Sequence, residues 1–135
     1  MDNKTKYLEL LKKNELKPTS QRIILSKILF SGRDMHFSAE DIRKVVLKKG
    51  FKMSLATIYN NLQTFADFGM IKQRRITKKK TYFDTNISDH YHFYDQKTGS
   101  LTDIPSALVK FTKLPKLPKN KIIKNLDLVI NIVDK

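Results

Sequence analysis

Apolar residues recur at helical spacing through the first half of the chain. The pattern predicts four helices, over residues 4–13, 20–31, 38–49 and 55–68. Residues that cap helix N-termini support the boundaries: Thr19 or Ser20 precedes the second helix, Ser38 with Asp41 begins the third, and Ser54 begins the fourth. We therefore expect four short amphipathic helices that share one apolar core.

After the helices, the pattern changes to short alternating segments. Two of them, 70–76 and 80–84, flank a basic turn, and helices followed by a basic hairpin are typical of a winged helix-turn-helix. Further strands are expected over 89–95, 100–104 and 121–133, with a short helix over 106–113. The expected fold is α+β: a winged helix-turn-helix over 1–84, a hinge over 85–88 and a small α/β region over 89–135, whose open terminal strand favours dimerisation.

The fourth expected helix has one apolar face and one uncharged polar face. At about 100° per residue, the apolar side collects Leu55, Ile58, Leu62, Phe65 and Ala66. The opposite side collects Thr57, Asn60, Asn61 and Thr64, with Tyr59 and Gln63 on its flank. Amides of this kind pair with adenine, and Tyr59 or Ala56 suits contact with thymine methyl groups. The alternative is an ordinary amphipathic helix with a polar exterior.

The charge of the chain favours a polyanionic partner and is concentrated in the first region. The net charge is +14, and residues 1–84 hold 19 of the 27 Lys and Arg but 8 of the 13 Asp and Glu. The hairpin formed by these two segments and their turn is especially basic, with Lys72, Arg74, Arg75, Lys78, Lys79 and Lys80. We expect this basic hairpin to contact phosphates or the minor groove of DNA. A lysine-rich solvated surface is the alternative.

A candidate metal site contains no thiols, because the chain has no cysteine. His90 and His92 form His-x-His in an expected strand, so both side chains project from one face with Cα atoms roughly 6.6 Å apart. Asp84 and Asp103 are near the same strands. Nitrogen and carboxylate ligands suit Fe(II), Mn(II) or Zn(II). Two surface histidines without a metal are the alternative.

Several classes of protein fit the sequence poorly. The absence of cysteine excludes disulfides and a Cys-ligated structural zinc. No nucleophile–base arrangement or phosphate-binding glycine loop indicates an enzyme. The longest apolar runs are far shorter than a membrane span, and the N-terminus lacks the apolar core of a signal peptide, so we expect a cytoplasmic protein with no membrane partner.

Together these residues resemble the ferric uptake regulator (Fur) superfamily. The resemblance spans about residues 16–104 and rests on LKPTSQR at 16–22, HFSAEDI at 36–42, ATIYNNL at 56–62 with Phe65 and Gly69, YFD at 82–84 and SDHYHF at 88–93. The Asn60-Asn61 pair, the HYHFY segment without cysteines, residues 101–105 and the 127–132 segment are most similar to the iron response regulator (Irr) branch.

The resemblance implies a bacterial homodimer that binds double-stranded DNA at an AT-rich inverted repeat and responds to iron, haem or another metal. It implies a regulatory metal held by His36, Asp84, His90, His92 and Asp103, and haem, if bound, on His90 and His92. Lys17, Arg22 and Tyr59 match positions that contact DNA in the family. With the residues suggested by the patterns, the expected DNA-binding set is Lys17, Arg22, Ala56, Thr57, Tyr59, Asn60, Asn61, Gln63, Arg75, Lys78, Lys79 and Lys80.

The chain also departs from the family. Asn60 stands where many relatives have arginine, and Asp95–Thr98 replaces the first of two Cys-x-x-Cys pairs, while the second pair and the Cys-Pro haem motif are absent. Because of Asn60, operator preference can differ from that of those relatives. The alternative function is a constitutive DNA-binding architectural protein without metal sensing.

Overall fold

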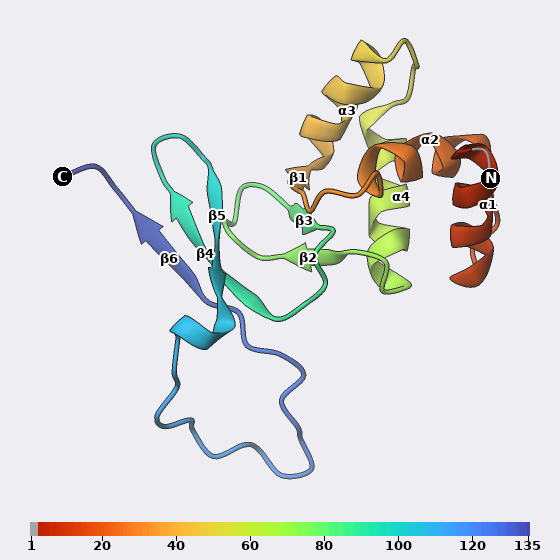
Figure 1. Ribbon diagram of the computed structural model, residues 1–135. Coiled ribbons are helices and arrows are strands. Elements are labelled where there is room, and N and C mark those ends of the chain that lie inside the picture. The colour runs from red at the N-terminus through yellow and green to blue at the C-terminus, as the bar shows by residue number, and fades with distance from the viewer. Residues whose placement is uncertain (1–2) are drawn as a thin grey trace. The chain divides into compact units, whose positions relative to one another are not determined.

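The computed structural model describes residues 3–135 and divides the chain into two compact units, one ending at Ile87 and one from Ser88 to Lys135 (Figure 1). The first unit combines four helices with a small sheet, and the second is built on another small sheet. The fold class is therefore α+β, as the sequence predicts. None of the helices in residues 3–135 has the length and apolar character needed to cross a bilayer.

The helices of the first unit are α1 (Asn3–Lys13), α2 (Ser20–Leu29), α3 (Ala39–Lys48) and α4 (Leu55–Asp67). They enclose one core because each helix turns an apolar stripe inward. The fully buried centre of that core includes Leu11, Leu25, Leu29, Val46, Ile58, Leu62, Phe65 and Phe83. On α4, Ile58, Leu62 and Phe65 are buried as expected, but Leu55 is exposed at the edge of the apolar stripe.

Local hydrogen bonds start the helices where the sequence predicts. Thr19 accepts from the Arg22 amide, and Ser54 accepts from the Thr57 amide. Ser38 and Asp41 form a complete capping box at α3. These bonds satisfy amide groups that have no partner within the helix, so they fix the point where α4 begins and thus which of its residues face outward.

The sheet of the first unit has the order β1-β3-β2, with antiparallel pairs of β1 (His36–Ser38), β3 (Tyr82–Asp84) and β2 (Lys72–Arg74). The sequence predicts longer strands over 70–76 and 80–84, whereas the pairing stops at three residues on each side of an irregular loop. Strand β1 was not expected at all, because three residues are too few to show alternation. It places His36 directly opposite Asp84.

The second unit has the order β5-β4-β6, in which the central β4 (His90–Asp95) pairs antiparallel with β5 (Leu101–Pro105) and parallel with β6 (Val129–Ile132). In Figure 1 a long irregular connection joins β5 to β6. Two expectations for this region are wrong. The helix over 106–113 is only a 3₁₀ turn, Ser106–Leu108, and the strand over 121–133 is only β6. Backbone pairing with β4 limits β6, since Val129 to Ile132 lie opposite His92 to Asp95, near the end of β4.

Candidate functional site

The outer face of α4 presents Ala56, Tyr59 and Asn60 to solvent. Tyr59 is 38% exposed, and its ring packs edge-on against buried Phe83 at a centroid separation of 6.1 Å. This contact limits the rotation of the ring while its outer edge stays accessible. The exposed groups are uncharged, so the face suits hydrogen bonds and methyl contacts with base edges better than contacts with phosphates.

Asn61, which the sequence placed on the same face, contacts the protein itself. Its Oδ1 accepts from Arg22 Nε at 3.2 Å, and its Nδ2 donates to the Thr57 carbonyl at 2.9 Å. Arg22 also donates from Nη1 to the Lys17 carbonyl at 2.9 Å. Arg22 thus ties the segment before α2 to α4, and both Arg22 and Asn61 are half-buried. This arrangement suits a role in orienting α4.

The other expected DNA-binding residues of this region differ in exposure. Lys17 is exposed, whereas Thr57 and Gln63 are half-buried. The Thr57 hydroxyl accepts from Ser54 at 2.9 Å, and Gln63 Nε2 donates to Asp67 at 3.2 Å on the same helix. Of the amide side chains on α4, Asn60 is therefore the exposed one, and it follows Tyr59 directly in sequence.

The loop between β2 and β3 carries the basic cluster of the expected wing. Arg75, Lys78, Lys79 and Lys80 are exposed, and the Lys80 ammonium lies 5.8 Å from the centroid of the Tyr82 ring. These positions suit electrostatic contact with a phosphate backbone. Arg74 differs, because it is only 6% exposed, with its Nε 3.5 Å from Asp84 Oδ2. Sequence analysis grouped Arg74 with the solvent-facing cations, and the structure places it inside the unit.

Two expected metal ligands, His36 and Asp84, face each other across the β1–β3 pair. A ring nitrogen of His36 and a carboxylate oxygen of Asp84 lie within 4.8 Å of each other. Asp84 is 1% exposed, and its Oδ1 accepts from the Asn86 amide at 2.8 Å. The first unit therefore holds one imidazole and one buried carboxylate in adjacent positions.

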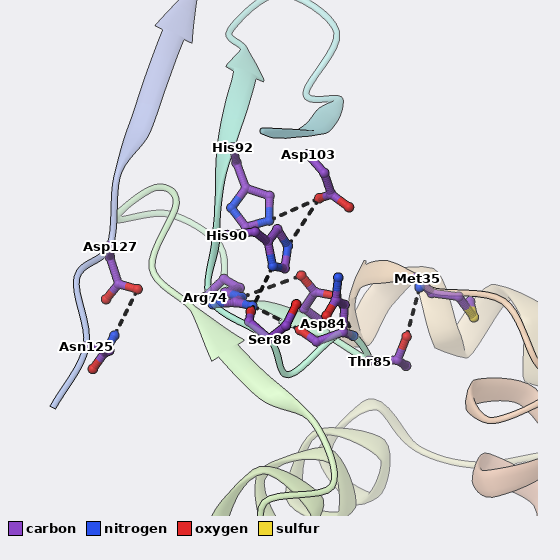
Figure 2. Close-up of polar contacts among 11 residues, drawn as sticks. Met35, Arg74, Asp84, Thr85, Ser88, His90, His92, Asp103, Asn125 and Asp127 are labelled. Carbon is purple, nitrogen blue, oxygen red and sulfur yellow. Dashed lines mark hydrogen bonds and ion pairs between the residues drawn. The ribbon is translucent and has the colours of Figure 1, made fainter. Parts of the chain in front are cut away.

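The other three expected ligands converge in the second unit (Figure 2). His92 lies opposite Asp103 in the β4–β5 pair, and the His90 and His92 rings are 4.6 Å apart between centroids. Both histidine Nε2 atoms approach the same atom, Asp103 Oδ1, at 3.3 Å for His90 and 3.4 Å for His92. Both rings are buried, whereas the Asp103 side chain is 42% exposed.

The hydrogen bond of His90 determines which of its nitrogens faces Asp103 as a ligand atom. Nδ1 lies 2.9 Å from the Ser88 carbonyl oxygen, which only accepts, so Nδ1 carries the hydrogen. In the neutral ring, Nε2 then directs its lone pair toward the Asp103 carboxylate. Two electron-rich atoms at that distance are stabilised by a cation between them, and a backbone carbonyl on the other ring nitrogen is the usual partner of a metal-bound histidine.

The distances fit a small divalent ion. Ligand atoms about 2.0–2.2 Å from a tetrahedral ion lie roughly 3.4 Å from one another. The two Nε2–Oδ1 separations, 3.3 and 3.4 Å, are close to that spacing. Nitrogen and oxygen donors without sulfur suit Zn(II), Mn(II) or Fe(II). The residues therefore fit a divalent transition metal.

Sequence reasoning missed two contributors to these clusters, Arg74 and the Ser88 carbonyl. Strand register brings Arg74 to Asp84, since Arg74 lies opposite Tyr82, two residues from Asp84 on the same strand. The alternation of β2 and β3 would have suggested this contact only with the hairpin register known. The Ser88 carbonyl is a backbone group, so no residue type marks it in a sequence.

Comparison with known proteins shows that the chain is similar to members of one family. Residues 13–130 match the model of the ferric uptake regulator family. A peroxide-responsive repressor, PerR, of Staphylococcus epidermidis is 34% identical over 93 residues, which are 69% of this chain and 61% of the relative. The peroxide operon regulator of Bacillus subtilis is 35% identical over 96 residues, 71% of this chain and 66% of the relative. The matched region thus spans somewhat less than two thirds of the length of these two relatives.

Solved structures show the same fold. The superposition on the ferric uptake regulator from Pseudomonas aeruginosa with manganese covers 96% of this chain and 98% of that chain, with a TM-score of 0.72 and 23% identity. The Vibrio cholerae ferric uptake regulator covers 94% and 98%, with a TM-score of 0.73 and 22% identity. A unit of four helices and a small sheet, followed in sequence by a second unit built on another small sheet, is therefore a shared architecture.

Proposed function

Because the chain belongs to the ferric uptake regulator family, we propose that it is a metal-responsive transcriptional regulator that binds double-stranded DNA as a homodimer. Members similar to it are named as repressors or operon regulators, which supports a regulatory role and no catalytic one. The observation that carries the proposal is the convergence of His90, His92 and Asp103 in a chain that also presents an uncharged, exposed α4 face.

For DNA binding, we assign base contacts to the exposed residues Ala56, Tyr59 and Asn60 of α4. Lys17 and the exposed cations of the β2–β3 loop, Arg75, Lys78, Lys79 and Lys80, would contact phosphates. Thr57 and Gln63 line the same helix and would contact DNA from its flank, while Arg22 and Asn61 would act mainly by holding α4 in place. An AT-rich inverted repeat suits the amide of Asn60 and the two-fold symmetry of a dimer.

For metal sensing, His90, His92 and Asp103 would hold a divalent ion, with His36 and Asp84 completing its ligands. The bound ion would supply a link between a winged-helix domain over 1–84 and a sensing and dimerisation domain over 89–135, across a hinge at 85–88. The separation of two recognition helices in a dimer must match the spacing of two DNA half-sites. A coupling of about 1–3 kcal/mol between metal and DNA would make a useful switch.

The identity of the sensed ligand, a metal ion or haem, is a finer part of the proposal. The sequence is similar to the iron response regulator branch at several segments, which would favour a response to iron or haem, with haem on His90 and His92. A similar solved structure, the Pseudomonas aeruginosa ferric uptake regulator, is described with manganese, which favours a bound metal ion over haem. The competing function, a constitutive DNA-binding protein, is favoured by one observation: Asp84 already has a guanidinium beside it.

A DNA-selection experiment tests the assignment of α4. Wild-type protein should enrich an AT-rich inverted repeat, and Asn60→Ala should relax preference at one base pair per half-site, because its amide is exposed. Asn61→Ala should instead weaken binding to all sequences alike. If Asn60→Ala and Tyr59→Ala both retain the wild-type sequence preference, α4 is not the reading element.

Metal titration tests the sensing role. Affinity for the selected operator is measured for the metal-free protein and with Fe(II), Mn(II), Zn(II) or haem, for the wild type and for His90→Ala. We expect an effective ligand to change wild-type affinity about 5- to 150-fold, corresponding to about 1–3 kcal/mol, and His90→Ala to abolish that change. Equal operator affinity under all conditions would leave the constitutive function standing.

A further inference from the structure

Within the sheet of the first unit, Arg74 of β2 and the proposed metal ligand Asp84 of β3 form a buried ion pair. Arg74 ends β2 opposite Tyr82, so its side chain lies diagonally across from Asp84. Its Nε is 3.5 Å from Asp84 Oδ2, and the side chains are 6% and 1% exposed (Figure 2). A guanidinium is charged at every physiological pH, so this cation is a permanent neighbour of the carboxylate.

The same guanidinium also holds the chain that follows β3. Arg74 Nη2 donates to the Asn86 carbonyl at 2.9 Å, and the Asn86 amide donates to Asp84 Oδ1 at 2.8 Å. Arg74, Asp84 and Asn86 thus form a closed set of contacts in which both oxygens of Asp84 face a donor. These contacts between protein groups hold the start of the proposed hinge at 85–88.

Burial makes this arrangement hard to explain as a DNA contact. Its neighbour Arg75 is exposed, whereas Arg74 would have to leave a buried carboxylate to reach a phosphate. Removing a charge from its buried partner is costly because the remaining charge is poorly solvated. The role of Arg74 is therefore to be sought at Asp84, inside the unit, and not at DNA.

We propose that Arg74 is an internal cation that competes with a divalent metal ion for Asp84. Like charges repel, so the guanidinium lowers the affinity of the site for metal. At the same time it keeps Asp84 and the 85–88 segment in place when no metal is bound. This inference rests on the proposed metal-sensing function. In it, the positive charge of Arg74 determines the metal concentration at which the protein responds.

The test compares metal affinity in three full-length proteins: the wild type, Arg74→Met and Arg43→Met. Arg43 lies exposed on α3, so its variant loses the same charge away from Asp84. Affinity for Zn(II) and Mn(II) is measured by competition with a chelating dye. We expect Arg74→Met to bind metal at least about tenfold more tightly, corresponding to about 1.4 kcal/mol, and Arg43→Met to match the wild type.

Thermal unfolding supplies a second readout that does not depend on DNA binding. Without metal, Arg74→Met should melt below the wild type, because Asp84 stays buried beside an apolar side chain. With saturating metal, its melting temperature should rise by more than that of the wild type, since tighter binding to the folded state stabilises it more. Should Arg74→Met not fold, Arg74→Lys replaces it and should bind metal as weakly as the wild type while melting lower.

The outcomes separate this inference from the proposed function. If the wild type binds metal and Arg74→Met binds it no more tightly, the competition is overturned and metal sensing stands. If only Arg74→Met binds metal, the competition is supported and the natural protein is a constitutive regulator. If neither binds metal, or if Arg74→Lys binds far more tightly than the wild type, the competition is rejected.

Discussion

The two units of this protein differ in how they bury apolar side chains. The unit up to Ile87 holds the entire hydrophobic core cluster, with Phe65, Leu62 and Phe83 fully buried. In the unit from Ser88, the buried apolar residues are Tyr91 and Ile104, beside buried His90 and His92. Its exposed apolar residues include Leu108, Phe111, Leu114, Leu117, Ile122, Ile123, Leu126, Ile130, Ile132 and Val133.

This difference shows that the units gain stability from different sources. The first unit packs four helices on a sheet and supplies its own core. The second is a small unit, of a size that usually needs oligomerisation or a metal as well. Its exposed apolar side chains and its converging histidines offer both, which agrees with the proposed homodimer and metal site. In a regulator built this way, the first unit would be stabilised by its own core, whereas the second would depend on a partner.

The largest expected effect is on the stability of the first unit. Phe65→Ala should lower the free energy of unfolding by about 3–5 kcal/mol, because it leaves a cavity in a fully buried position. Urea unfolding followed by circular dichroism measures the loss. Phe68→Ala, at the exposed end of the same helix, is the control and should cost under about 1 kcal/mol. Equal losses in both variants would contradict the assignment of the core.

An intermediate effect is expected on self-association through the second unit. Ile122 is 90% exposed, and Ile122→Asp should weaken the dimer about 10- to 100-fold, or about 1.4–2.8 kcal/mol, if a second copy covers this surface. Analytical ultracentrifugation over a range of concentrations measures the dissociation constant. Leu47→Asp, at an exposed position of α3, is the control and should leave assembly unchanged. Were both variants to assemble like the wild type, the exposed apolar residues of the second unit would have another role.

The smallest expected effect concerns an ion pair at the end of the second unit. Lys97 Nζ lies 3.0 Å from Asp134, and both side chains are largely exposed. Lys97→Ala should therefore change unfolding free energy by under about 0.5 kcal/mol, since solvent and salt screen such pairs. Wild-type unfolding in added salt should show a similarly small change. A loss above about 1 kcal/mol would mean that this pair, and not only backbone pairing with β4, holds β6 in place.

The sequence determined the features that depend on near neighbours. The capping box of Ser38 and Asp41, the cap at Ser54 and the apolar stripe of α4 each involve residues three or four positions apart. Alternation likewise predicted that His90 and His92 share a face. Their common carboxylate neighbour, Asp103, was suggested by its position in sequence and brought into place by the β4–β5 register.

Only the tertiary structure decided the contacts between distant segments. Strand β1 exists because it pairs with β3, Arg74 is buried because the hairpin register brings it to Asp84, and Asn61 turns to Arg22 across 39 residues. The expected strand over 121–133 is short for the same reason, since only Val129–Ile132 pairs with β4. Local patterns report the conformation of a few turns of chain. Which polar group faces DNA, metal or protein depends on the free energy of packing segments that the sequence keeps far apart.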